Sequence, residues 1–339
     1  MQDRHSSIAH AAYIDLLNLL RDEQVSKIQG TPRLEKRNGK RYWYDTFRVG
    51  TSVKKRYIGE DTPELADRIA RQNQLVRDQA FATEHRTKLV RTLRAQGIQA
   101  MEASVGSLLS AMEQAGAFRL GATIIGTYAF RMYEGELGLP LRQADTTQTN
   151  DIDIAQFERL SLSLALNDTV EPSLATTFKD FDFAPVPALF SRSHWRWRQT
   201  KSQTMVEFLT PSFRSEEDIR ELPALGVAAQ SLHFLNFLIA EPIKAAALYR
   251  SGVLVQIPRP EAYAIHKLIV ANRRTGDTRL KAVKDRQQAA LLIRALAEDR
   301  PADLKDAYDD AMARGEKWRD HIGASLTRMP ESAALIAAL

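Results

Sequence analysis

The stretch DIDIA, residues 151–155, alternates charged and apolar residues and therefore predicts a β-strand. Side chains two apart along a strand point to the same face, so Asp151 and Asp153 would lie side by side. The isoleucines between them would enter the core. Two adjacent carboxylates repel each other unless a cation lies between them, and Mg²⁺ prefers oxygen ligands of this kind. The stretch thus predicts a cation site on one face of a sheet.

A second signal precedes this strand. The apolar run ATII, residues 122–125, is followed by Gly126-Thr127 and then by a helical pattern. Gly126 has no Cβ, so the backbone there can approach a phosphate closely, and the N–H groups at the start of a helix favour anions. The junction predicts a phosphate-binding turn formed by Gly126 and Thr127.

A third carboxylate would complete a site for two metal ions. Glu207 is flanked by Val206 and Phe208, as expected on a central strand, and Asp182 is the competing candidate. We favour Glu207 because its strand, TMVEFLT (204–210), is the second arm of a predicted hairpin whose first arm is HWRWRQ (194–199). Arginine and tryptophan alternate in that first arm, a pattern that fits either nucleic-acid contacts or a hairpin with tryptophan in the core.

The order of these features resembles the nucleotidyltransferase superfamily, which has the polymerase-β-like fold. Its pattern is a strand, a Gly-Ser or Gly-Thr that opens a helix, an Asp-x-Asp on the next strand, and a third acid on another strand. The likeness covers about residues 110–300 and extends to a poorly characterised bacterial nucleotidyltransferase subgroup. The C-terminal features that carry it are IPRPE (257–261), AIHKL (264–268), Arg273-Arg274, Lys281, Lys284-Asp285 and Gln288. The interval from Gly126 to Asp151 is longer than the family usually has, so an insertion over residues 135–150 is expected.

The resemblance implies transfer of a nucleoside monophosphate from an NTP to an acceptor hydroxyl, with two Mg²⁺ ions and release of pyrophosphate. The acceptor class stays open between RNA, protein and a small molecule, since relatives include RNA-tailing enzymes, antibiotic-modifying enzymes and nucleotidylating toxins of toxin–antitoxin pairs. The implied catalytic and metal-binding residues are Asp151, Asp153 and Glu207, and the implied nucleotide-binding residues are Gly126, Thr127, Lys267, Lys284 and Asp285.

The positive charge of the chain is concentrated at its N-terminus. The whole sequence has 47 Lys and Arg against 42 Asp and Glu, whereas residues 1–100 alone have 19 basic and 12 acidic side chains. Ten of the basic residues fall between Lys27 and Arg56, interleaved with aromatic residues. This composition fits a binder of the nucleic-acid backbone, and a solvated, lysine-protected sheet edge explains it equally well. The candidate nucleic-acid contacts are Lys36, Arg37, Lys40, Arg41, Lys54, Lys55 and Arg56.

Local patterns predict most of the remaining elements. Apolar spacing indicates helices over residues 8–21, 62–96 and 102–116, and a helical pattern from Leu232 to the end. The Asn38-Gly39 pair between runs of β-type composition predicts an antiparallel meander over residues 32–59.

Composition narrows the class of protein. The absence of cysteine excludes disulfides, thiolate metal sites and cysteine nucleophiles. Neither a secretory signal nor an uninterrupted apolar span is found, so we expect a cytoplasmic protein that does not span a membrane.

The expected fold class is α+β, with a mixed-sheet nucleotidyltransferase core, a helical C-terminal part and a small N-terminal β-meander. The expected divisions are an N-terminal helix and basic meander (1–61), a helical connector (62–101), the core (102–230) and a helical C-terminal domain (231–339). The alternative function is a catalytically silent protein of this fold that acts as a nucleic-acid-binding or regulatory module of toxin–antitoxin type.

Overall fold

The computed structural model describes residues 4–28, 30–37, 39–49, 52–141, 151–165, 168–187, 193–214 and 216–339. Within these residues the strands are β1 (Thr31–Arg37), β2 (Lys40–Val49), β3 (Ser52–Glu60), β4 (Thr123–Ile125), β5 (Asp151–Ala155), β6 (Phe183–Pro185), β7 (Arg196–Gln199), β8 (Met205–Pro211), β9 (Ile219–Leu222), β10 (Val227–Leu232), β11 (Ile243–Ala247) and β12 (Val253–Ile257). The α-helices are α1 (Ser7–Ser26), α2 (Pro63–Ala70), α3 (Gln72–Arg77), α4 (Gln79–Ala95), α5 (Ala103–Gln114), α6 (Gly126–Leu137), α7 (Glu158–Ala165), α8 (Leu174–Asp180), α9 (Leu235–Leu238), α10 (Pro260–Arg273), α11 (Arg279–Asp299), α12 (Pro301–Ala313), α13 (Glu316–Leu326) and α14 (Pro330–Ala337).

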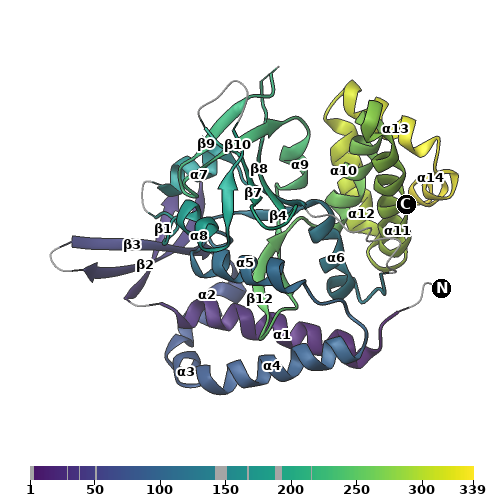
Figure 1. The fold of residues 1–339 in the computed structure, drawn as a ribbon. Coiled ribbons are helices and arrows are strands. Elements are labelled where there is room, and N and C mark those ends of the chain that lie inside the picture. Colours follow the sequence, from purple (N-terminus) through teal and green to yellow (C-terminus); the bar gives the residue numbers. More distant parts are fainter. Residues whose placement is uncertain are drawn as a thin grey trace.

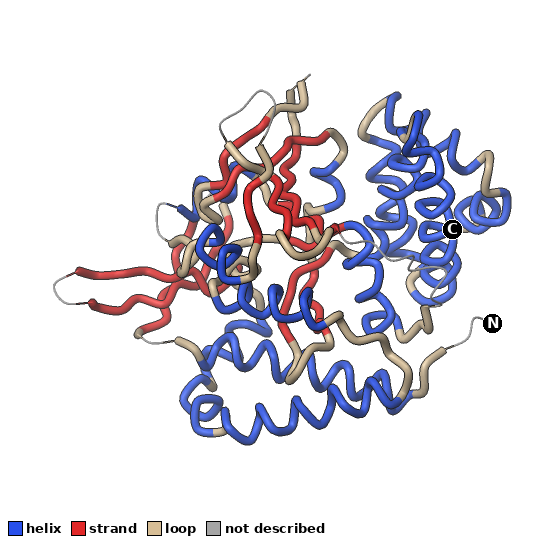
Figure 2. The backbone as a smooth tube through the Cα atoms, viewed as in Figure 1, coloured by secondary structure: helices blue, strands red, loops and turns tan. Residues whose placement is uncertain are grey.

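The central sheet of the described residues has the strand order β4-β5-β8-β10-β9, with β7 and β6 continuing from β8. It is mixed, because β5, β8 and β10 run parallel to one another while β4, β7 and β9 pair antiparallel with their neighbours. Helices α10 to α14 pack together beside this sheet, as Figures 1 and 2 show. The fold is therefore α+β, with a helical C-terminal part, as the sequence predicts.

The N-terminal part has a sheet of its own. Strands β1, β2 and β3 form an antiparallel meander, and its β2–β3 arm extends away from the body of the molecule in Figure 1. The next helix begins where the sequence indicates: the Thr62 side chain accepts a hydrogen bond from the Leu65 amide, and Pro63 occupies the first turn. Asn38, part of the predicted turn, lies outside the described residues.

One hydrophobic core joins the central sheet to the C-terminal helices. It includes Ile152 and Ile154 of β5, which are fully buried, and extends through Tyr263 of α10 to Leu292 of α11. A second cluster packs α1 against α4 and the β11–β12 hairpin. None of the helices in the described part of the chain combines the length and the apolar character needed to cross a membrane.

Two sequence predictions are wrong. The predicted helix over residues 62–96 is three helices, because the chain bends at Arg71 and Asp78 and so keeps α2, α3 and α4 in contact with α1. The helical pattern predicted from Leu232 onward is interrupted by the β11–β12 hairpin, which Arg250 and Gly252, both at positive φ, close. Alanine-rich β11 has good helix formers, but packing against α1 and β12 overrides that preference. Residues 142–150 of the predicted insertion lie outside the described residues.

Candidate active site

The turn between β4 and α6 lies directly against the first carboxylates. Strand β4 pairs antiparallel with β5 so that Ile125 is opposite Asp153, and Gly126 begins α6 at a φ of +63°. A Cβ on Gly126 would lie far inside van der Waals contact with Asp153 Oδ2. Glycine is therefore required here both by the left-handed backbone and by the close approach of the carboxylate.

The carboxylates of β5 face the third acid on the neighbouring strand. Strand β8 runs parallel to β5 with Glu207 in register with Asp153, and Asp151 lies on the same face of β5. We call Asp151, Asp153 and Glu207 the acid cluster. Burial, with repulsion from Glu207 and Asp151, raises the pKa of Asp153 to about 7, although the positive charges of two nearby lysines oppose the shift. Burial, more than its neighbours' charges, thus makes the anionic form of Asp153 costly here.

Glu207 has a cationic partner on the hairpin. Arg196 of β7 is opposite Glu207 in the ladder, and its Nε lies 2.8 Å from Glu207 Oε1. The same guanidinium stacks over the Trp195 ring at 4.0 Å from the ring centroid. Burial raises the pKa of Glu207 even though Arg196 opposes this. Asp182, the competing candidate for the third acid, is instead in the turn before β6, paired with exposed Lys201.

The helical part contributes groups that hold the turn at Gly126-Thr127. The Tyr263 hydroxyl donates to the Gly126 carbonyl oxygen at 2.8 Å, and Lys284 Nζ donates to Thr127 Oγ1 at 3.1 Å. Burial lowers the pKa of Lys284, with the charge of Lys267 adding to the effect. The structure therefore brings Gly126, Thr127 and Lys284 together beside the acid cluster.

Lys267 and Asp285 form a buried pair behind this turn. Lys267 Nζ lies 2.6 Å from Asp285 Oδ1, and Arg274 Nε lies 3.0 Å from the other oxygen of the same carboxylate. Burial alone would raise the pKa of Asp285, but the charges of Lys267 and Arg274 outweigh it and the pKa is lowered. In this arrangement Asp285 orients two cations, and the positive charge of Lys267 still acts on Asp153.

The oxygen-only donor set of the acid cluster suits Mg²⁺. Asp151 and Asp153 share a face; burial and, after it, repulsion from Glu207 and Asp151 raise the pKa of Asp153, and a divalent cation would relieve the repulsion. Within the described residues, however, no three His, Cys, Asp or Glu side chains stand close enough together to form a ready-made metal site. Glu207 would join the two aspartates only by exchanging its contact with Arg196.

Three residues that contact or act electrostatically on the candidate site were not among the site residues predicted from the sequence. Arg196 could have been found, because the predicted hairpin already places it opposite Glu207. Tyr263 is one helical turn before Lys267, so the shared helix face was a usable signal. The charge of Lys281 acts on both Asp153 and Glu207. Lys281 lies three residues before Lys284, and this spacing places the two on the same face of a helix.

Most of the candidate nucleic-acid contacts in the meander form ion pairs with acids of the same sheet or with Asp61, which directly follows it. The pairs are Arg37 with Glu35, Lys40 with Glu60, Arg41 with Asp61, Lys55 with Glu35 and Arg56 with Asp45. For exposed Lys36 and Lys54, the described part of the chain offers no carboxylate partner. A pair exposed on both sides, such as Lys40 with Glu60, exchanges readily with other anions, whereas the Asp45 carboxylate that holds Arg56 is fully buried. The exposed cations of the meander remain a candidate surface.

Comparisons with known proteins place this site in a family. A family model described as "Nucleotidyltransferase" matches residues 103–313, and one described as "Domain of unknown function (DUF6788)" matches residues 13–67. The search of curated proteins found no match. The crystal structure of an antigenic nucleotidyltransferase-like protein from Paracoccidioides brasiliensis is similar at 12% identity and a TM-score of 0.32, over 70% of this chain and 94% of that chain. Because the first model spans more than half of the sequence and includes the whole acid cluster, the chain belongs to the nucleotidyltransferase family.

Proposed function

We propose that the protein is a Mg²⁺-dependent nucleotidyltransferase that moves a nucleoside monophosphate from an NTP to an acceptor hydroxyl. The observation that carries the proposal is the strand register: it sets Asp153 beside Glu207 and directly against Gly126. Carboxylates next to a glycine turn at a helix start provide adjacent places for a cation and for phosphates. RNA, a protein and a small molecule all remain acceptor candidates.

Each group would have a distinct task. Asp151 and Asp153 would hold both metal ions, and Glu207 would bind the catalytic one and help to activate the acceptor hydroxyl after releasing Arg196. Bound Mg²⁺ would supply charge stabilisation for the attacking and leaving oxygens. The backbone at Gly126 and Thr127 would hold the β- and γ-phosphates. Lys284 and Lys267 would offset the negative charge that builds on the leaving pyrophosphate.

The test is labelling with each of four α-³²P NTPs in the presence of Mg²⁺, with cell RNA, cell protein and the protein itself as acceptors. Asp151→Ala/Asp153→Ala is expected to abolish labelling while the protein stays folded by circular dichroism. The matched control is Asp182→Ala, which removes an exposed carboxylate outside the acid cluster and is expected to label as the wild type does. Labelling by the double variant near the wild-type level would contradict the proposal, and the labelled fraction would identify the acceptor class.

A second candidate is favoured by the contact between Arg196 and Glu207, which neutralises one acid of the cluster without a metal. On this alternative the nucleotidyltransferase fold is catalytically silent, and the protein is a nucleic-acid-binding or regulatory module of toxin–antitoxin type. Binding would then depend on salt and on the meander cations, Lys36 and Lys54 included, and would survive loss of the acid cluster. Absence of labelling with every NTP, together with salt-dependent RNA binding by the double variant, would favour this alternative.

A further inference from the structure

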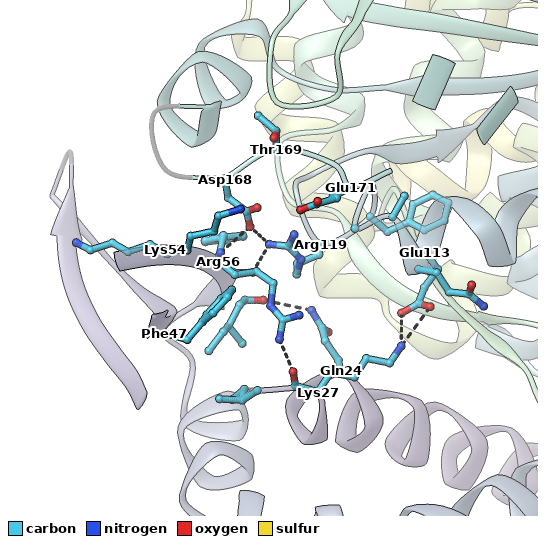
Figure 3. A pocket seen from close by; sticks show the side chains of 18 of the residues that line it. Gln24, Lys27, Phe47, Lys54, Arg56, Glu113, Arg119, Asp168, Thr169 and Glu171 are labelled. Atoms are coloured by element: carbon cyan, nitrogen blue, oxygen red, sulfur yellow. Dashed lines mark hydrogen bonds and ion pairs between the residues drawn. The ribbon is translucent and has the colours of Figure 1, made fainter. Parts of the chain in front are cut away.

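A cavity of about 1030 Å³ lies where the N-terminal part meets the core. We call it the seam cavity. One wall comes from α1, β2 and β3, within the region matched by the domain of unknown function, and the other from the nucleotidyltransferase region. The principal lining residues are Lys27, Phe47, Arg56, Glu113, Arg119 and Lys244. Figure 3 shows the Arg56 side chain pointing toward Lys27 and the Arg119 side chain beside Asp168.

The seam cavity is separate from the acid cluster. Phe118 and Arg119 line the cavity just before β4 begins, whereas Gly126 follows the end of β4. Strand β4 therefore runs from one site to the other. No residue of the acid cluster lines the cavity.

Ion pairs across the seam fix the positions of several cations. Lys27 Nζ lies 3.3 Å from a Glu113 oxygen, and Arg119 bonds both the Asp168 carboxylate and the Tyr57 carbonyl oxygen. These contacts join α1 to α5 and β3 to the core. They hold the two walls together, so the cavity has a defined shape.

Lys244 differs from these cations because its partners are neutral. Its Nζ donates to the Phe118 carbonyl oxygen at 3.2 Å and to Gln256 Oε1 at 3.0 Å, and the described residues offer it no carboxylate within ion-pair distance. An ammonium has three N–H donors, so one is left for another acceptor. Burial lowers the pKa of Lys244 to about 8; the positive charges of Arg21 and Arg119 add to this, and Glu113 opposes it. A partly buried ammonium without a counter-charge is costly unless an anion joins it.

We propose that the seam cavity binds a nucleotide through its phosphate, either free or as a unit of a single-stranded nucleic acid, with Lys244 as the anion contact. The volume is that of a small-molecule site, and it is large enough for a base and a ribose beside the phosphate. Phe47 lines the same space and offers an aromatic face for the base. Because both family regions form the walls, a ligand here would tie the N-terminal part to the core.

The test measures binding of two probes in EDTA, which suppresses metal-dependent binding at the acid cluster. The probes are AMP, followed by calorimetry, and 5′-phosphorylated, fluorescein-labelled hexaadenylate, followed by anisotropy. Lys244→Met removes the ammonium while keeping an unbranched side chain and is expected to weaken binding about tenfold, the usual effect of losing a charge-assisted hydrogen bond. The control Lys88→Met removes an exposed charge on α4 and should bind as the wild type does. Binding of AMP would identify a free nucleotide as the ligand, and binding of the hexamer alone would identify a strand.

A pH series on the wild type tests the same contact without a mutation. The charged groups that face Lys244 are Arg21 of α1, Glu113 of α5 and Arg119, with neutral Gln256 of β12. Only the ammonium form holds the phosphate, so affinity should fall as the pH rises from 7 to 9.5, and Lys244→Met should show no such fall.

Three results would overturn the proposal: equal affinity in Lys244→Met and the wild type, a flat pH series, or no binding of either probe at 1 mM, roughly the affinity of a weak metabolite site. Loss of binding in Lys284→Met alone would place the probe at the acid cluster and overturn it as well.

Discussion

The acid cluster and the seam cavity lie at opposite ends of β4, and acids define the first whereas cations outnumber acids in the lining of the second. At the acid cluster three carboxylates lie on neighbouring strands, and the charges of lysines from α10 and α11 act on them. At the seam cavity most cations are already paired, and Lys244 is left with neutral partners. On our proposals, the first site would take a cation together with phosphates, and the second an anion alone.

The two sites also differ in how the chain builds them. The register of adjacent strands sets the acid cluster, so a few residues on β5 and β8 determine it. The seam cavity depends on segments far apart in the sequence, from Gln24 to Leu254, that meet only after the N-terminal part docks. We therefore expect point changes at the acid cluster to affect chemistry and changes at the seam to affect stability and binding.

The largest effect is expected for Gly126→Ala. The new Cβ would displace the Asp153 carboxylate, and an error of about 1 Å in a catalytic group costs roughly a hundredfold in rate. Nucleotidyl transfer should therefore fall by about a hundredfold or more in the labelling assay.

Gly226→Ala is the matched control for this change. Gly226 has a φ of +65°, nearly that of Gly126, but a Cβ there meets nothing within 4 Å. Both variants should lose about 1 kcal/mol of stability from the left-handed backbone, while Gly226→Ala keeps full activity. Similar activity losses in the two variants would show that backbone strain, rather than the contact with Asp153, explains the glycine.

A smaller effect, on stability, is expected when Asp168→Ala removes an ion pair at the seam cavity. Asp168 accepts a hydrogen bond from the Tyr57 amide at 2.8 Å and forms an ion pair with Arg119, and both side chains of this pair are largely buried. Leaving Arg119 without its carboxylate should lower the free energy of unfolding in urea by about 2 kcal/mol, somewhat less than for a fully buried pair. The exposed pair of Asp182 with Lys201 provides the control, since Asp182→Ala should cost less than about 0.5 kcal/mol. Equal losses would show that the seam contact is no stronger than a surface pair.

Much of the acid cluster could be predicted from sequence because its signals are local. The alternation in β5, the Gly126-Thr127 step and the hairpin of β7 and β8 each depend on residues close together in the chain. The α+β class follows from the same elements. Residue patterns alone do not say that these features belong to one site. That inference came from the resemblance, because the features occur in the order typical of the family.

The seam cavity could not be predicted, because Lys244 lies in a segment whose composition favours a helix rather than the strand that it forms. Residues 243–247 contain three alanines and read as helix, so Lys244 was placed on a helical pattern rather than on β11. Its neighbours Phe118 and Gln256 are more than ten residues away in either direction. Only tertiary packing shows that this lysine has neutral partners at the edge of a cavity.

The smallest effect we expect is a pH dependence of stability that comes from Lys244. Its pKa is about 8 in the folded protein and near 10.4 in an unfolded chain, so between these values the unfolded state binds more protons. The free energy of unfolding of the wild type should therefore rise with pH across this window, relative to Lys244→Met, by roughly 1 kcal/mol after allowance for partial exposure. Urea unfolding at pH 7, 8, 9 and 10 measures the difference, and a constant difference would show that Lys244 carries no uncompensated charge. Repeating the series with saturating AMP sharpens the comparison of the two sites: an anion beside Lys244 raises its pKa toward the unfolded value and flattens the slope, whereas a nucleotide bound at the acid cluster leaves the slope unchanged.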